Sequence, residues 1–189
     1  MRSDQAFRVS FMIGASPPVQ AMIAAKRIYC LTPNPASTRM WSHYAENHRG
    51  ICLEFNVTNA LFGRACQVTY RPDYPRWVLC DFHDNPGRVM ELILTKSLDW
   101  DHEEEYRLVS VQAPAHEFLC TRGDFFRLPD GALRSVIIGC EADHRAIAEV
   151  VRKSAPSLPI KQSVRTGNLY KLTIRDYPFP PSTRNPDII

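Results

Sequence analysis

The chain has 189 residues, of which 44% are hydrophobic and 23% are charged, and its net charge is +3. This length favours one domain with its own core, and the mild, scattered positive charge gives no strong argument for nucleic-acid binding. No apolar run is long enough to span a membrane. An acid and two prolines interrupt the N-terminal apolar stretch, which we expect to belong to the fold rather than to a signal peptide.

Six cysteines stand at positions 30, 52, 66, 80, 120 and 140. A chain of this length does not need a disulfide framework, and it carries no convincing export signal. Cys30, Cys52 and Cys140 also lie in apolar runs, where a thiol packs as a small hydrophobic group. We therefore expect reduced cysteines in a cytoplasmic protein.

Helices and strands alternate in the first half of the chain. Ser16 followed by two prolines is typical of a helix N-terminus. Residues 38–48 have a helical pattern, with Ser37 or Thr38 as the cap and Gly50 at the end. The predicted elements are a helix over 19–27, a strand over 27–32, a helix over 38–48, and strands over 50–57 and 66–72.

The second half adds two helices and further strands. The clearest helix covers residues 142–155, and its predicted apolar face comprises Ala146, Ile147, Val150 and Val151. The other predicted elements are a helix over 89–98, strands over 102–111, 125–129 and 135–140, and a hairpin over 159–174. This order predicts a single α+β domain over 1–175, with a largely antiparallel β-sheet, whole or split, flanked by a few helices. A proline-rich tail over 176–189 follows.

The first candidate site is the segment MWSHYAENHRGICLEF, residues 40–55, which contains Trp41, His43, Tyr44 and His48. On a helix, residues 41 and 44 share a face, so both rings are candidates for the core. Alternatively, one ring stacks on a planar ligand while His43 donates a hydrogen bond to a sugar or a phosphate. The residues alone leave both interpretations open.

The second candidate site is WDHEEEYR, residues 100–107. On a strand, Glu103, Glu105 and Arg107 would project from one face, with neighbouring positions about 7 Å apart. Two carboxylates this close raise one another's pKa, and Arg107 offsets that effect. The arrangement suits a general base, or a carboxylate that orients a sugar hydroxyl. It equally suits a charged edge strand that discourages aggregation.

The third cluster pairs Cys80 with His83 and His116 with Cys120, which is a weak zinc pattern because neither pair has the CxxC form. We therefore expect no bound metal. The sequence also contains no GxGxxG, GxxxxGK[ST], HExxH or GxSxG motif, which disfavours Rossmann, P-loop, zincin and serine-hydrolase mechanisms.

Four segments, MWSHYAENHRGICLEF, VTYRP, KSLDWDHEEEYRL and LRSVIIGC, closely resemble a large, mostly uncharacterised family of bacterial and phage-associated domains. The shared motifs are W-x-H-Y-x-x-x-H-x-G-hydrophobic-C and K-x-x-x-W-x-x-E-x-E-Y-R. The resemblance runs from about residue 28 to about residue 174 and implies a shortened member, because the family's N-terminal Asn-Asp-Pro turn is missing.

The E-x-E pair and the later segment FFRLPDGALRSVII resemble, more loosely, the C-terminal part of ADP-ribosyltransferase domains. This resemblance implies that His43 binds the ribose of NAD and that Tyr44 or Tyr70 stacks on nicotinamide. It also implies that Glu105, assisted by Glu103, stabilises an oxocarbenium-like transition state. The predicted catalytic residues are Glu105, Glu103 and His43, and the predicted cofactor-binding residues are His43, Tyr44, Trp41, Tyr70 and Arg107.

The leading hypothesis is therefore an NAD-dependent ADP-ribosyltransferase-like domain of a bacterial toxin or defence system, with NAD as the candidate substrate and no membrane partner. A second hypothesis is a non-catalytic partner-binding module of a defence or mobile-element protein. It predicts that Arg107 forms a buried pair with a glutamate. A third is a metal-assisted hydrolase or nuclease that uses His43, His48, Glu103 and Glu105.

Overall fold

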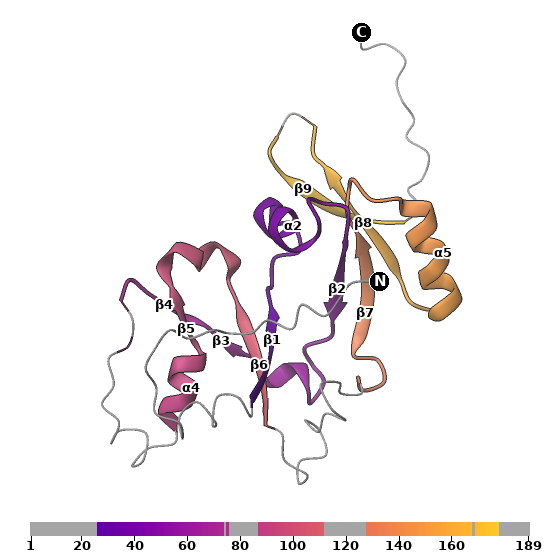
Figure 1. The fold of residues 1–189 in the computed structure, drawn as a ribbon. Helices are drawn as coiled ribbons and strands as arrows, with labels where there is room; N and C mark the ends of the chain where they lie inside the picture. Colours follow the sequence, from indigo (N-terminus) through magenta and orange to yellow (C-terminus); the bar gives the residue numbers. More distant parts are fainter. Residues whose placement is uncertain (1–25, 74, 76–86, 112–127, 168, 178–189) are drawn as a thin grey trace.

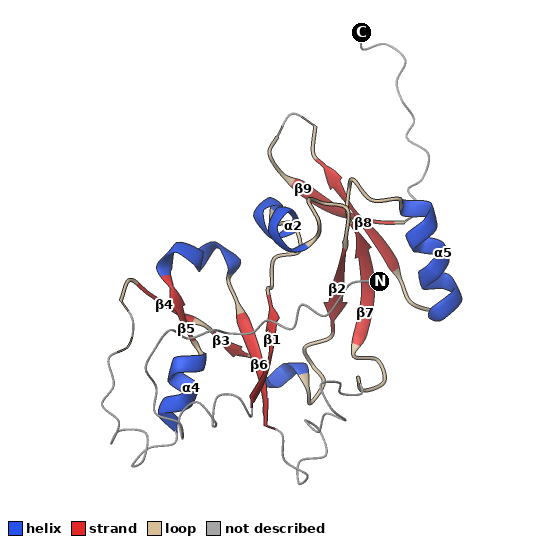
Figure 2. Cartoon of the chain, viewed as in Figure 1, coloured by secondary structure: helices blue, strands red, loops and turns tan. Residues whose placement is uncertain are grey.

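The computed structural model describes residues 26–73, 75, 87–111, 128–167 and 169–177 (Figure 1). Helices and strands are interspersed along these residues, and most strand pairs are antiparallel (Figure 2). The predicted α+β class is therefore confirmed. Most of the predicted helix over 19–27, most of the predicted strand over 125–129 and both Cys/His pairs lie outside the described residues. The helix is wrong at its last two residues, Lys26 and Arg27, which begin a strand. The predicted domain limits, 1–175 and 176–189, stay a prediction.

The β-structure is split into three sheets. In the three-stranded sheet, β6 (Tyr106–Val111) lies between β1 (Lys26–Leu31) and β3 (Cys66–Gln67), and both pairs are antiparallel. In the two-stranded sheet, β4 (Thr69–Arg71) pairs in parallel with β5 (Thr95–Ser97). The predicted single strand over 66–72 is therefore wrong, because the chain leaves one sheet for another at Val68, which is buried.

The four-stranded sheet has the order β2 (Ile51–Phe55), β7 (Leu133–Ile138), β8 (Ile160–Arg165) and β9 (Leu172–Asp176). Because β7 and β8 are parallel, they need a crossover, and α5 (His144–Ser154) provides it. The strands β8 and β9 form the predicted hairpin, whose turn contains Gly167 at φ +47°. The predicted strand over 135–140 and the hairpin are confirmed.

Two helices pack on opposite faces of this sheet. Ala148 of α5 packs against Ile138 and Ile160, whereas Trp41 of α2 (Thr38–Tyr44) packs against Ile137. Neighbouring strand residues point to opposite faces, so the two helices cover opposite sides. The apolar face predicted for α5 is wrong in part, because Val150 is 63% exposed while Ala148 is fully buried. None of the described helices is long and apolar enough to cross a membrane.

A second core cluster joins the three-stranded and four-stranded sheets. It consists of Leu61, Phe62, Leu108 and Ala132, with Leu31 and Phe55 packed against it. Phe62 begins a short 3₁₀ helix, η1 (Phe62–Arg64), and its ring stacks on that of Phe55 with centroids 4.2 Å apart. This cluster fixes β1 and β6 relative to β2.

The helix α2 ends four residues earlier than predicted. Ser37 caps its start by accepting a hydrogen bond from the amide of Met40. After Tyr44 the chain turns through three left-handed residues, at φ +48°, +53° and +69°, which a helix cannot contain. The carbonyl of the last of these, His48, lies against Gly139, where a Cβ atom would overlap it.

The segment 87–107 also differs from the prediction. The helix α4 (Gly87–Ile93) is followed by β5, so the predicted helix over 89–98 is wrong in its second half. Residues Leu98–Glu103 form the 3₁₀ helix η2, and Glu104 adopts a left-handed conformation at φ +49°. The predicted strand over 102–111 therefore starts only at Tyr106, and Glu103 does not share it with Arg107.

Candidate functional site

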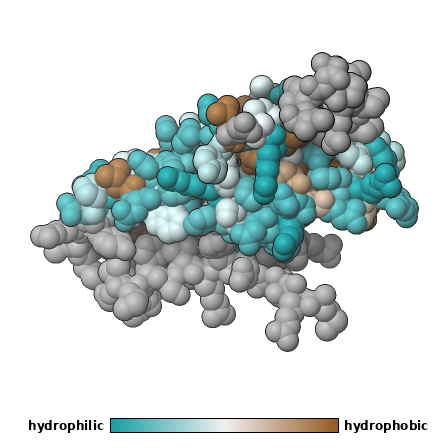
Figure 3. Space-filling model, turned by 90° about the horizontal axis from the view of Figure 1, so that it is seen from above, coloured by the Kyte–Doolittle hydropathy of each residue, from teal (hydrophilic) through white to brown (hydrophobic). Residues whose placement is uncertain are grey.

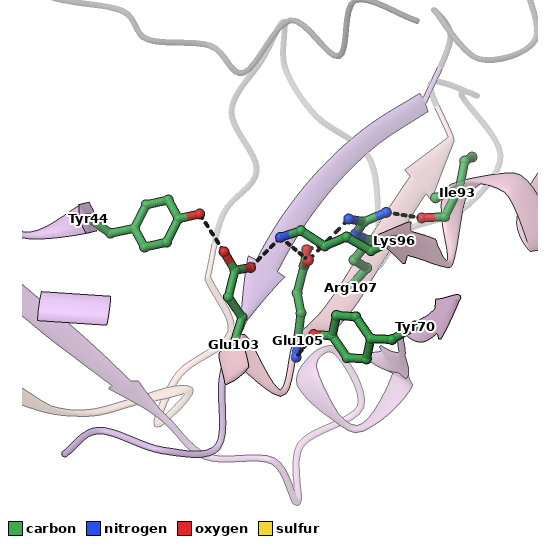
Figure 4. A network of polar contacts seen from close by, with 7 residues as sticks. All are labelled: Tyr44, Tyr70, Ile93, Lys96, Glu103, Glu105 and Arg107. Carbon is green, nitrogen blue, oxygen red and sulfur yellow. Dashed lines mark hydrogen bonds and ion pairs between the residues drawn. The ribbon is translucent and has the colours of Figure 1, made fainter. Parts of the chain in front are cut away.

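The two sequence motifs meet in a buried charge network (Figure 4). The Tyr44 hydroxyl, at the end of α2, donates a 2.7 Å hydrogen bond to Glu103 Oε1. Lys96 Nζ, on β5, donates to Glu103 Oε2 and to Glu105 Oε2, the latter at 3.0 Å. Arg107 holds Glu105 through two bonds, from Nε at 2.7 Å and from Nη2 at 3.1 Å. Two carboxylates and two cations thus alternate along one line.

Backbone contacts fix the network to the surrounding elements. Arg107 Nη1 donates to the carbonyl of Ile93, the last residue of α4. The amide of Glu105 donates to the Tyr70 hydroxyl at 2.7 Å, and its carbonyl accepts from Val68 at 2.9 Å. Since carbonyls at a helix end lack partners within the helix, the Ile93 contact also caps α4. The left-handed turn at Glu104 brings Glu103 and Glu105 to the same lysine.

Burial and hydrogen bonding together determine the pKa values of the ionisable side chains in the network. Glu103 and Glu105 are each only 3% exposed. Burial alone would raise the pKa of Glu105, but hydrogen bonds from Arg107, Cys30 and Lys96 outweigh it and hold the pKa at about 2. Burial likewise opposes the charge of Lys96, yet its bonds to the two glutamates raise its pKa overall. Glu105 is therefore ionised at neutral pH, and Arg107 opposes a raised pKa of this carboxylate, as the sequence predicted.

Two members of the network, Lys96 and Cys30, are not among the site residues predicted from the sequence. Lys96 belongs to the K-x-x-x-W motif, and that spacing is the signal that could have identified it. Cys30 lies opposite Arg107 in the register of β1 and β6. Although part of Cys30 is exposed, loss of water around the thiol and its hydrogen bond to Glu105 raise its pKa to about 12. The thiol therefore stays protonated.

Four rings adjoin the network and form what we call the ring cluster, namely His43, Tyr44, Trp100 and His102. The centroids of His43 and Trp100 are 6.3 Å apart with perpendicular planes, and those of Trp100 and His102 are 6.1 Å apart. His43 also lies 6.2 Å from Tyr44. Lys96 Nζ lies 5.3 Å from the Trp100 centroid, so it joins the cluster to the network. Tyr44 and Trp100 remain 50% and 38% exposed.

The structure does not bring Trp41 to this site. Its ring is buried against Ile137 and Leu172, and its Nε1 donates a 2.7 Å hydrogen bond to the carbonyl of Pro35. The large apolar ring is thus part of the core, which was the alternative interpretation of the motif. His48 belongs to the left-handed turn, and its Nδ1 is buried with no hydrogen-bond partner among the described residues.

The described residues give the hydrolase hypothesis no ligand set. Within residues 26–177, the gaps in the description excepted, no group of three or more His, Cys, Asp or Glu side chains lies close enough to hold a metal ion. The other predicted site residues come together: Glu103, Glu105, Arg107, Tyr44 and Tyr70 are in the network, and His43 is in the ring cluster.

A family model described as "Protein of unknown function (DUF2971)" matches residues 40–75. This span contains the first motif and Tyr70, so the resemblance to an uncharacterised family is confirmed over these residues. Comparison with curated proteins and with solved structures finds no match. The resemblance to ADP-ribosyltransferases stays a prediction.

Proposed function

We propose that this chain is a non-catalytic binding module, in which the buried charge network holds the ring cluster at the surface for a partner. The observation that carries the proposal is that all four carboxylate oxygens of Glu103 and Glu105 already accept hydrogen bonds from the chain. A general base needs an accessible oxygen and a pKa near the working pH. Glu105 has a pKa of about 2 and is almost fully buried.

The pairing of Arg107 supports the same proposal. The hypothesis of a binding module predicts that Arg107 pairs with a buried glutamate, and Arg107 makes a two-bonded contact with Glu105. Such a pair contributes to the structure when both partners are present, because removing one leaves an uncompensated buried charge. The free thiols of Cys30, Cys52, Cys66 and Cys140 fit a reducing, cytoplasmic setting.

The test compares Glu105→Gln with Glu149→Gln, because Glu149 forms an exposed pair with Lys153 on α5. We expect Glu105→Gln to lower the melting temperature clearly and Glu149→Gln to leave it nearly unchanged. Neither variant nor the native protein should consume NAD when labelled NAD is followed by chromatography. Consumption of NAD by the native protein that is lost in Glu105→Gln would refute the proposal.

An ADP-ribosyltransferase-like activity on NAD, in a bacterial toxin or defence protein, is the second candidate. It is favoured by the meeting of the two motifs, because His43 and Tyr44 lie beside Trp100 and Glu103. For this reaction, Glu105 would have to exchange Lys96 or Arg107 for a ribose hydroxyl. Transfer of labelled ADP-ribose to a lysate protein, abolished by His43→Ala, would support it.

A further inference from the structure

The ring cluster has the composition of a protein-binding surface. Tryptophan and tyrosine are enriched among the residues that dominate binding energy, because they bury a large area with few rotatable bonds. Trp100 and Tyr44 keep 38% and 50% of their area exposed, and Leu98, on η2 with Trp100, is 49% exposed. Seen from above, the described residues present a mainly hydrophilic surface with small, separate hydrophobic areas (Figure 3).

The exposed rings are held in place by contacts with the charge network and with one another. Tyr44 donates to Glu103, and Lys96 lies over Trp100 while it bonds both glutamates. His43 contacts Trp100 edge-on. A partner that binds these rings would therefore immobilise little that is not already ordered, which lowers the entropic cost of association.

Carboxylates flank the rings on η2. A 3₁₀ helix has three residues per turn, so Asp99 and Asp101 lie on either side of Trp100 along the helix. Both aspartates are exposed, as is Glu104, which caps the helix. The two cations of the network, Lys96 and Arg107, add little positive charge, because the buried glutamates neutralise them. The surface around Trp100 is thus acidic although the whole chain carries +3.

Two arginines on neighbouring elements only partly offset this charge. Arg71, which lies beside Ser97 in the register of β4 and β5, forms an ion pair with Glu91 at 3.8 Å. Arg39 is exposed on α2, four residues before His43. Glu46 and Arg49 are both exposed in the turn after that helix, and their charges offset one another. The exposed charged side chains of η2 and its cap, by contrast, are all acidic.

We infer that the ring cluster binds an arginine-rich segment of a partner protein. A guanidinium is planar and cationic, so it stacks on Trp100 or Tyr44 and pairs with carboxylates through two hydrogen bonds. Asp101 and Glu104 provide these carboxylates next to the rings. The inference rests on the proposed binding function and names the partner's chemistry. A ligand with phosphates would meet the same carboxylates as repulsive charges.

Calorimetric titration of the full chain tests the inference, with a synthetic arginine–glycine peptide, its lysine–glycine counterpart and NAD as probes. We expect the arginine peptide to bind best and to bind more weakly at high salt. Trp100→Ala should weaken binding about tenfold. The exposed pair of changes Asp101→Asn and Glu104→Gln should weaken it several-fold without affecting the fold. Tyr170→Ala is the control, because Tyr170 is a fully exposed ring outside the cluster.

Two results would overturn the inference. One is an arginine peptide that does not bind, or that binds the Trp100→Ala and Asp101→Asn/Glu104→Gln variants as well as the native chain. The other is tighter binding of NAD that Trp100→Ala removes, which would assign the rings to a nucleotide. NAD consumption with unchanged peptide binding would instead refute only the proposed non-catalytic function, so the two failures are distinguishable.

Discussion

Replacement of Glu105 by glutamine tests the buried charge network most directly. The pKa of Glu105 is about 2, against an ordinary value of 4.5, because hydrogen bonds from Arg107, Cys30 and Lys96 outweigh the effect of burial. That difference corresponds to about 3 kcal/mol that favours the ionised carboxylate in the folded state. Glu105→Gln should therefore lower the free energy of unfolding by about 3 kcal/mol at neutral pH, or the melting temperature by about 6–12 °C.

The stabilisation that Glu105 provides should decrease as the pH falls. Because the pKa is lower in the folded state, the unfolded chain binds the proton first as the pH falls. The contribution of Glu105 is thus complete above about pH 4.5 and is lost as the pH falls to about 2. Urea unfolding of the native chain and of Glu105→Gln should show two curves that converge over this range. A difference that stays constant with pH, or one below about 1 kcal/mol at neutral pH, would refute the reasoning.

Two other substitutions and one labelling experiment probe the surrounding structure. Tyr44→Phe keeps the ring but removes the hydroxyl that donates to Glu103. Chemical denaturation should therefore show a free energy of unfolding lower by about 1–2 kcal/mol. An unchanged free energy of unfolding would mean that water replaces the hydroxyl. Gly139→Ala places a Cβ atom onto the carbonyl of His48. Thermal unfolding should therefore show a melting temperature lower by several degrees, or a protein that fails to fold. A native-like transition would contradict that contact. The Cys30 thiol has a pKa of about 12, so mass spectrometry should find it alkylated slowly by iodoacetamide at about pH 8; fast labelling in the native protein would disagree.

Local patterns were sufficient to predict most of the fold. The strands β1, β2 and β7, the hairpin of β8 and β9, and the helix α5 all follow from alternation, apolar periodicity and turn residues. The errors fall where tertiary contacts override local preference. Residues 46–48 and Glu104 adopt left-handed conformations although none of them is glycine. Asn47 and His48 are of residue types that adopt this conformation more often than most, but Glu46 and Glu104 are not, so residue type alone does not place the interruptions.

Part of the candidate site could be predicted from the sequence, but its residues meet by another arrangement than the predicted one. Glu103, Glu105 and Arg107 do come together, but through a left-handed turn and Lys96 rather than along one strand. Lys96 was missed because its segment has the pattern of a helix, whereas the structure places it on β5. Cys30 was missed because its partner lies 77 positions later, in the register of a neighbouring strand that one sequence does not reveal.

The long separation in sequence between the partners of the charge network has a consequence for the folding pathway. Tyr44 and Glu103 are 59 positions apart, and Arg107 reaches back 14 positions to the end of α4. Neither glutamate loses its water until these segments have met, so we expect the network to form after the folding transition state. Removing one of its charges would then mainly accelerate unfolding and leave the folding rate almost unchanged. The network would thus set how long each molecule stays folded rather than how fast it reaches that state.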